Sequence, residues 1–260
     1  AAIPVIKTLR EGLAGTDINR VYGILNGTCN YILTRMEQEG LSFAECLKDA
    51  QRLGYAEANP SFDVDGHDTA QKLAILASLA FGTKVAQSAV YVEGISSIAP
   101  EDLRAAEELG YRVKLLGVAV RTAKGIEQRV HPTMVPKSSS IAQVMGVTNA
   151  VTIDGEGIPP ITLVGPGAGG AATASAVVAD IADVARGIRA KPFGRPVERL
   201  QSTTKAPMER HEGGYYIRLM ARDLAGTAAT IATRLAEQKI SLESIVQRHP
   251  DGVDANGAAK

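Results

Sequence analysis

The sequence is poor in several residue types, and each shortage narrows the range of functions. Its 260 residues include no Trp, four Phe and two Cys, Cys29 and Cys46. Two cysteines are too few for a disulfide framework, and their spacing matches no metal-ligand motif. The four scattered His form no zinc-binding cluster. These shortages predict a protein of the reducing cytoplasm without a metal site.

The sequence also has no excess of positive or negative charge and no long hydrophobic run. Lys plus Arg and Asp plus Glu both number 28, so the formal net charge at pH 7 is zero and indicates neither a nucleic acid nor an anionic membrane as partner. No apolar run reaches the roughly 18 residues that span a bilayer. With 45% hydrophobic and 22% charged residues, the chain has the composition of a globular protein with an aliphatic core.

Hydrophobic periodicity predicts an α/β protein of the α+β type, in which helices cover a mixed, largely antiparallel sheet. Residues 111–121 and 126–135 predict an antiparallel hairpin. The other expected strands are 18–25, 89–98, 149–155 and 160–165, and the expected helices are 3–13, 31–40, 42–53, 66–82, 100–110 and 171–187. Beyond a polar boundary at 189–212, a strand, a helix and a strand at 215–223, 224–239 and 241–248 predict a small C-terminal βαβ unit.

The densest group of reactive side chains lies between residues 50 and 72. It contains Glu57, Asp63, Asp65 and Asp68 and ends at Lys72. Asp68 and Lys72 are four residues apart, so they share one face of the expected helix. A lone pair of this kind is usually an ordinary surface ion pair. The density of carboxylates at a loop-to-helix junction instead favours a site for a zwitterionic small molecule, with carboxylates for an ammonium group and a lysine for proton transfer.

Two further segments combine a strand end, glycine and a following helix. Residues 26–30, NGTCN, form either an ordinary turn or a place where backbone N–H groups meet a ligand. Residues 165–170 fit GxGxxG, the dinucleotide-binding fingerprint, but no second strand follows, and no acidic residue ends a strand about 20 residues later. We therefore interpret residues 165–170 as a glycine loop that a backbone or a ligand approaches closely.

The residues of 50–72 also carry a family resemblance. In order and spacing, the segment resembles the signature of homoserine dehydrogenases at Ala50, Gly54, Tyr55, Asn59, Pro60, Asp63, Val64, Gly66, Asp68 and Lys72. The segments IPVIKTLREGL, GILNGTCNYIL and VGPGAGGAATASAVVAD extend the resemblance over roughly residues 1–200. The tail, with Asp223 and Gly226, resembles the start of an ACT domain. The implied domains are a catalytic and dimerisation domain at 1–200, a linker at 201–212 and a truncated ACT-like domain at 213–260.

The resemblance implies NAD(P)-dependent interconversion of L-homoserine and L-aspartate 4-semialdehyde, in threonine, methionine and isoleucine biosynthesis. It also implies a homodimer or higher homo-oligomer through the sheet, and threonine as an effector of the ACT-like unit. By the resemblance, we expect that the family's N-terminal Rossmann domain is missing from this chain. The chain starts without Met inside an expected helix, so we expect a fragment that is inactive by itself.

The resemblance also implies roles for single residues. Lys72 would transfer the proton, and Asp68 would orient it and hold the substrate hydroxyl. Glu57 would bind the substrate ammonium, with Asp63 assisting. The other implied contacts are Asn26, Gly27, Thr28 and Tyr55 with the substrate, and Gly167 and Gly169 with the nicotinamide. The family's second lysine and its metal-ion site have no counterpart that can be placed on these residues.

Two alternatives stay open from the sequence. One is a non-catalytic amino-acid-sensing or oligomerisation module, which the ACT-like tail and the missing cofactor domain favour. The other is a Rossmann enzyme that binds pyrophosphate at residues 165–170. The choice between NAD and NADP, regulation by threonine and fusion to an aspartate kinase also stay open.

Overall fold

A long antiparallel hairpin lies in the middle of the sheet that forms the fold. The computed structural model describes residues 2–202, 213–221 and 224–246. Strands β3 (Tyr111–Thr122) and β4 (Gly125–Pro136) pair antiparallel along their whole length, with Gly117 opposite Val130, so the predicted hairpin is confirmed. Contacts divide the chain into two units, residues 1–212 and 213–260, which are described separately.

The first unit contains one six-stranded sheet in the order β2-β4-β3-β1-β5-β6. Only the short β2–β4 pair is parallel among the described strands, which confirms the predicted mixed, largely antiparallel sheet. The remaining strands are β1 Ile18–Ile24, β2 Tyr91–Val92, β5 Thr148–Gly155 and β6 Ile161–Pro166. The edge strand β6 is antiparallel to β5, whereas a Rossmann unit needs parallel neighbours.

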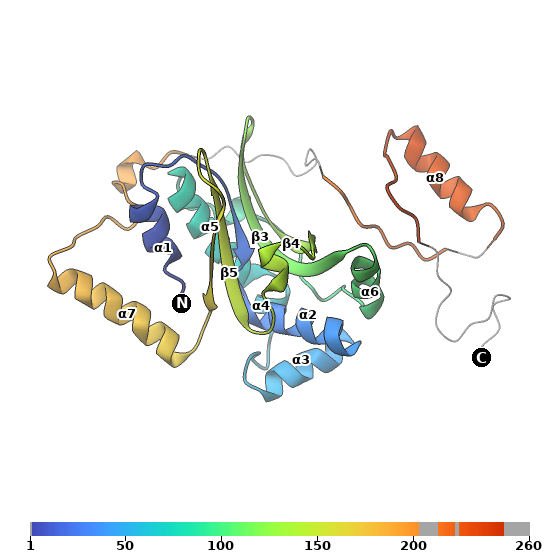
Figure 1. Cartoon of the computed structure of the whole chain (residues 1–260), viewed down its shortest axis with the longest axis horizontal. Coiled ribbons are helices and arrows are strands. Elements are labelled where there is room, and N and C mark those ends of the chain that lie inside the picture. The colour runs from blue at the N-terminus through green and yellow to red at the C-terminus, as the bar shows by residue number, and fades with distance from the viewer. Residues whose placement is uncertain (1, 203–212, 222–223, 247–260) are drawn as a thin grey trace. The chain divides into compact units, whose positions relative to one another are not determined.

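Helices cover the sheet (Figure 1). The helices of the first unit are α1 Val5–Lys7, which continues as a π-helical turn at Thr8–Gly12, α2 Gly27–Glu39, α3 Phe43–Arg52, α4 Ser61–Val64, α5 His67–Phe81, α6 Pro100–Glu108 and α7 Gly170–Ala185. Short 3-10 turns lie at Gln87–Ala89, Ser140–Gln143 and Val197–Arg199. Helix α5 packs across β1, β3 and β4, and α2 packs on β3, β5, α3 and α6.

The main hydrophobic core lies between the sheet and the helices α2, α3 and α5. Val21, Ile32 and Leu73 are fully buried there. A smaller cluster joins Ile24 of β1 to Leu116 of β3 and to the segment that follows β4. The two clusters hold the C-terminal end of β1 and the N-terminal end of α2, and the candidate site lies where these two ends meet.

Helix α7 is apolar but mostly exposed. It contains Val177, Val178 and Ile181, each more than half exposed, and Asp183 is its single buried residue. The Asp183 carboxylate lies 2.5 Å from Lys7 Nζ of α1. Helix α7 is therefore tied to the rest of its unit by a polar contact, and its apolar side chains face solvent within the described residues.

Several element boundaries differ from the predictions. Residues 26–30 are not a turn, because Asn26 caps α2 and Gly27 begins it. The strand expected at 89–98 is reduced to the two residues of β2, and the helix α4 was not predicted. The capping box of Ser42 and Glu45 at the start of α3 is confirmed.

The second unit contains the helix α8, Thr227–Glu237. The predicted strands at 215–223 and 241–248 are wrong over residues 215–221 and 241–246, which form no strand. A strand needs a neighbour for its N–H and C=O groups, and neither segment pairs with a described strand. Residues 222–223 and 247–248, and most of the predicted linker 201–212, lie outside the described residues. The ACT-like interpretation therefore keeps only its helix.

Candidate active site

The centre of the candidate site is the side chain of Asn26 at the end of β1. Its Oδ1 accepts a hydrogen bond from Cys29 N at 2.9 Å, as an N-cap does. Its Nδ2 donates to Asp63 Oδ1 and to Asp68 Oδ2, both at 2.8 Å. One buried amide therefore caps α2 and holds two carboxylates that the sequence places in different helices.

Asp68 and Lys72 lie on one face of α5, as their spacing predicts. Lys72 Nζ donates to Asp68 Oδ2 at 2.7 Å and to the Leu25 carbonyl at 3.1 Å. The Lys72 side chain is 48% exposed and that of Asp68 is 19% exposed. Asp68 Oδ2 thus accepts from both Asn26 and Lys72, and the ammonium group stands at the border between protein and solvent.

Gly66 sets the direction in which α5 leaves the carboxylate segment. Its φ is +87°, a value that favours glycine, and a Cβ there would lie 3.1 Å from Val130 Cγ1 and 3.2 Å from Val92 Cγ1. The backbone conformation therefore favours glycine, and the two valine side chains would have to move by a few tenths of an ångström to admit a Cβ. This turn follows the end of α4 at Val64 and places Asp68, in the first turn of α5, within hydrogen-bonding distance of Asn26.

Thr28 and Tyr55 meet beside the cluster. Thr28 Oγ1 donates to the Tyr55 carbonyl at 2.6 Å, and the Tyr55 ring packs edge-on against Tyr31 with 5.0 Å between centroids. The Tyr31 hydroxyl donates to Asp49 at 2.6 Å. These contacts attach the segment after α3 to α2, so that Glu57 is carried toward the site.

Glu57 is exposed, and its carboxylate has no hydrogen bond or ion pair with a described residue. Its backbone carbonyl accepts from Gln51 Nε2 at 3.0 Å. The structure thus joins Asn26, Asp63, Asp68 and Lys72 directly, and leaves Glu57 as a separate carboxylate in the same segment.

The glycine loop meets the start of α2 through Asn149, a residue that the sequence interpretation missed. A Cβ at Gly167 would overlap the Asn149 side-chain amide, and a Cβ at Gly27 would lie 2.8 Å from Val147 O and 3.4 Å from Asn149 Oδ1. Asn149 is 6% exposed, and its Oδ1 has no hydrogen-bond partner among the described residues. Gly169, with φ of +111°, caps α7. The sequence offers no signal for Asn149 beyond a polar residue in an apolar strand.

The Cys29 thiol lies under the carboxylates but is not a reactive group. Burial, and after it the charges of Asp63 and Asp68, raise the pKa of Cys29 well above its usual range. Cys29 Sγ donates to the Asp63 carbonyl at 3.2 Å. The thiol is therefore a packing and hydrogen-bonding group. Among the described residues, no three His, Cys, Asp or Glu side chains are grouped as metal ligands.

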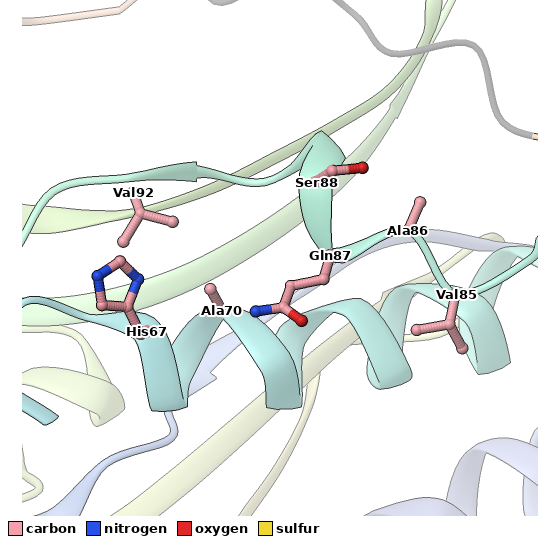
Figure 2. A pocket seen from close by; sticks show the side chains of 7 residues that line it. All are labelled: His67, Ala70, Val85, Ala86, Gln87, Ser88 and Val92. Carbon is pink, nitrogen blue, oxygen red and sulfur yellow. The ribbon is translucent and has the colours of Figure 1, made fainter. Parts of the chain in front are cut away.

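A separate hollow of about 550 Å³ lies on another face of α5 (Figure 2). His67 and Ala70 come from α5, and the other lining residues come from the segment that runs beside this helix in Figure 2. The lining residues are His67, Ala70, Val85, Ala86, Gln87, Ser88 and Val92. None of them is a predicted site residue, and His67 is the single ionisable group in the lining, so the carboxylate cluster remains the better candidate.

Comparison with known proteins decides the family. A family model described as homoserine dehydrogenase matches residues 4–182. The chain belongs to the homoserine dehydrogenase family. Homoserine dehydrogenase of Neisseria gonorrhoeae is 48% identical over 252 residues, which cover 95% of this chain and 58% of that protein. That of Pseudomonas aeruginosa is 46% identical over 258 residues, which cover 97% and 59%.

Solved homoserine dehydrogenases share the fold. The structure from Thiobacillus denitrificans matches with a TM-score of 0.84 and 44% identity, over 95% of this chain and 58% of that chain. A hyperthermophilic archaeal homoserine dehydrogenase in complex with NADPH matches with a TM-score of 0.62 and 29% identity, over 73% and 54%. The resemblance stated from the sequence is confirmed for the family. The chain spans less than two thirds of the length of these relatives.

No helix among the described residues has the length and apolar character needed to cross a bilayer.

Proposed function

We propose that this protein interconverts L-homoserine and L-aspartate 4-semialdehyde with NAD or NADP, and that residues 1–200 supply the substrate-binding and proton-transfer part of the site. Family membership supports the reaction class. The observation that carries the proposal is the Asp68 carboxylate, which accepts from both Asn26 and Lys72 at the start of α5. A lysine held by a carboxylate at a solvent border is suited to exchange a proton with a substrate oxygen.

Lys72 has the hydrogen-bonding capacity that this role needs. An ammonium group has three N–H donors, and two of them are used by Asp68 and the Leu25 carbonyl. The third is free for the substrate oxygen. In the reductive direction, the aldehyde carbon gains a hydride and its oxygen gains a proton from Lys72, which regains one from solvent. Oxidation reverses both transfers, so atoms and charges balance.

The carboxylates would bind the other end of the substrate. Glu57 has an unpaired carboxylate within the described structure, and Asp63 has one oxygen that Asn26 does not use. Both suit an ammonium group, which donates several charge-assisted hydrogen bonds. Asn26, Gly27, Thr28 and Tyr55 would line the same pocket, since the contacts of Asn26 and Thr28 attach the two segments to each other.

The residues at the glycine loop fit the nicotinamide end of NAD(P). Asn149 Oδ1 is a buried acceptor without a described donor, which suits an amide N–H, and a side chain at Gly167 would fill the space beside it. Gly167 and Gly169 would hold the ring edge, with Asn149 as the polar contact. When bound, the nicotinamide supplies the hydride acceptor or donor. The archaeal relative whose structure contains NADPH supports the cofactor class.

The partners that we propose are a second copy of the chain and threonine. The family resemblance supports a homodimer or higher homo-oligomer through the sheet; the apolar cluster with Leu116 and Val118 on that sheet is already buried within this chain. Threonine would act at residues 213–260, where α8 alone among the predicted ACT-like elements supports the idea. The same lack of strands weakens the alternative of a non-catalytic sensing module.

Replacement of Lys72 tests the reaction. In the gene product as the cell makes it, we expect Lys72→Ala to lower kcat for homoserine oxidation by roughly 10²- to 10⁴-fold, because a positioned acid or base contributes about that much. The KM for homoserine should change little. Lys48→Ala, at an exposed position of α3, is the matched control and should leave turnover unchanged. If Lys72→Ala folds and retains turnover within about threefold of the native rate, the proton-transfer assignment is wrong.

A further inference from the structure

Lys114 on β3 is a buried ammonium group that the proposed mechanism does not use. It is 1% exposed, and its Nζ donates to Val144 O at 2.6 Å and to Asn30 Oδ1 at 2.9 Å. Met145 Sδ lies 3.4 Å from the same nitrogen. No carboxylate is hydrogen-bonded to it within the described residues. A buried charge without an opposite partner is costly, so its presence requires a reason beyond packing.

Asn30, one turn after Asn26 on α2, holds the same segment as Lys114. Its Nδ2 lies within hydrogen-bonding distance of three carbonyls, Val144 O at 3.1 Å, Gly146 O at 2.9 Å and Thr148 O at 3.1 Å. Thr34 Oγ1 accepts from Gly146 N at 3.0 Å and donates to Asn30 O at 2.7 Å. Side chains of β3 and α2 therefore bind four backbone groups of the loop at residues 144–148.

This loop leads directly to the junction between the two parts of the candidate site. Val147 O lies against Gly27, where any side chain would collide with it. Asn149, the next residue after the loop, lies between Gly27 and Gly167. A shift of the loop would therefore change the distance between the start of α2, which carries Asn26, and the glycine loop.

We propose that Lys114 is a positioning residue for the reaction proposed above: with Asn30 it holds the loop at residues 144–148 so that Asn149 stands between the start of α2 and the glycine loop. The inference rests on the proposed function for its kinetic consequence, but its structural part does not. Lys114 Nζ contacts Asn30, Val144 and Met145, and no contact joins it to Asp68 or Lys72 among the described residues, so its effect on catalysis would pass through the loop.

Few charged groups act on Lys114. Arg112, two residues before it on β3, and Glu37 of α2 are the two whose charges influence it, and they pair with each other at 2.8 Å. Residues 140–148, which include the loop, contain no charged residue. The residue opposite Lys114 on β4 is Thr133, which is also uncharged. Burial, followed by the charge of Arg112, lowers the pKa of Lys114 to about 8.

The experiment compares Lys114→Met and Lys114→Gln with the native gene product. The methionine keeps the bulk but donates nothing, whereas the glutamine amide restores an uncharged donor to the Val144 carbonyl. We expect Lys114→Met to lower kcat about 10- to 100-fold, with the KM for homoserine within about threefold, since small misplacements of reacting groups have effects of that size. Lys114→Gln should recover a clear part of that loss.

Hydrogen–deuterium exchange of residues 144–149 gives a readout that is independent of activity. In Lys114→Met this segment should exchange at least several-fold faster than in the native protein, while the core of α5 keeps its protection. Unchanged exchange overturns the positioning role, and so does faster exchange with unchanged kcat. An equal loss of kcat and of thermal stability in both variants indicates a purely structural lysine, and also overturns it.

The outcome can be separated from a failure of the proposed function. If the native gene product does not turn over homoserine, or if Lys72→Ala is fully active, the reaction assignment fails whatever Lys114 does. If Lys72→Ala is inactive and Lys114→Met is indistinguishable from native in both exchange and kcat, the positioning role alone fails.

Discussion

Helices α5 and α7 are alike in sequence and opposite in packing. Each begins directly after a glycine with positive φ, Gly66 or Gly169, and each is rich in Ala and aliphatic residues. Helix α5 buries nine of its residues, including Leu73, against the sheet, whereas α7 buries Asp183 alone. Figure 1 shows α5 along the sheet and α7 set apart from it.

The difference shows what apolar composition does and does not determine. A helix that is apolar on most faces has surface that favours burial. In α5 that surface is buried within this chain, and the helix can hold Asp68 and Lys72 at fixed positions. In α7 it is exposed among the described residues, so the glycine loop is positioned by the pairing of β6 with β5 and by the contact of Gly167 with Asn149. The two parts of the candidate site therefore differ in how rigidly this chain supports them.

The largest expected effect comes from truncating one aliphatic side chain in each helix. Leu73→Ala in α5 should lower the free energy of unfolding by about 2–5 kcal/mol, because it removes a fully buried side chain and leaves a cavity. Val184→Ala in α7, at a position 74% exposed, should change it by no more than about 0.5 kcal/mol. Urea unfolding followed by circular dichroism measures both.

Equal destabilisation by the two variants would contradict the comparison. It would mean that Val184 is covered in solution, in which case the same measurement across a range of protein concentrations shows whether a second copy of the chain covers it.

The sequence predicted best where local signals and burial agree. The strand-like segments at 111–121 and 126–135 are separated by the short turn TAKG, and they form the hairpin β3–β4. The spacing of Asp68 and Lys72 predicts that they share one helix face, and they do so in α5. Both features depend on residues that are close in sequence, so the sequence pattern alone predicts them.

Features that depend on distant contacts were missed or wrong. Asn26 was expected in a turn, but it caps α2 and bridges Asp63 and Asp68, which are 37 and 42 residues away. Asn149 and Lys114 look in sequence like polar interruptions of strands, and only the packing shows what they hold. The tail at 215–221 has the aromatic and aliphatic residues that favour a strand, but it pairs with no described strand.

An intermediate effect on the free energy of unfolding is expected from a change of pH, through Lys114. This residue holds the loop at residues 144–148, which lies between the carboxylate cluster of α5 and the glycine loop that precedes α7. The pKa of Lys114 in the folded protein is about 8, below its ordinary 10.5. The buried charge therefore imposes its whole energetic penalty on the folded state at pH values below 8. Between pH 8 and 10.5 the unfolded chain binds more protons than the folded one, so stability rises with pH. The penalty is roughly 3 kcal/mol at neutral pH and about 2 kcal/mol smaller at pH 9.5.

The measurement is the unfolding free energy of the native protein minus that of Lys114→Met, at neutral pH and near pH 9.5. Subtracting the variant removes the titration of every other group that is unaffected by the substitution. We expect the difference to rise with pH by about 2 kcal/mol. A difference that falls with pH would mean that the ammonium form is favoured by the fold, and that Lys114 has an acidic partner in solution.

The smallest expected effect is at the ion pair that ties α7 to α1. The Lys7 side chain is 37% exposed and that of Asp183 is 12% exposed, so Lys7→Ala should lower the free energy of unfolding by no more than about 0.5 kcal/mol, and by less in high salt. Lys48→Ala, at an exposed position of α3, is the matched control for losing a lysine.

Hydrogen exchange should respond differently from global stability in this variant. If α7 is held by this contact and not by packing, Lys7→Ala should raise exchange along the whole of α7 while α5 stays protected. Exchange in α7 that stays as slow as in α5 would mean that the apolar face of α7 is buried in solution. In that case the contrast between the two helices belongs to the isolated chain and not to the working protein, and the glycine loop is as firmly supported as the carboxylate cluster.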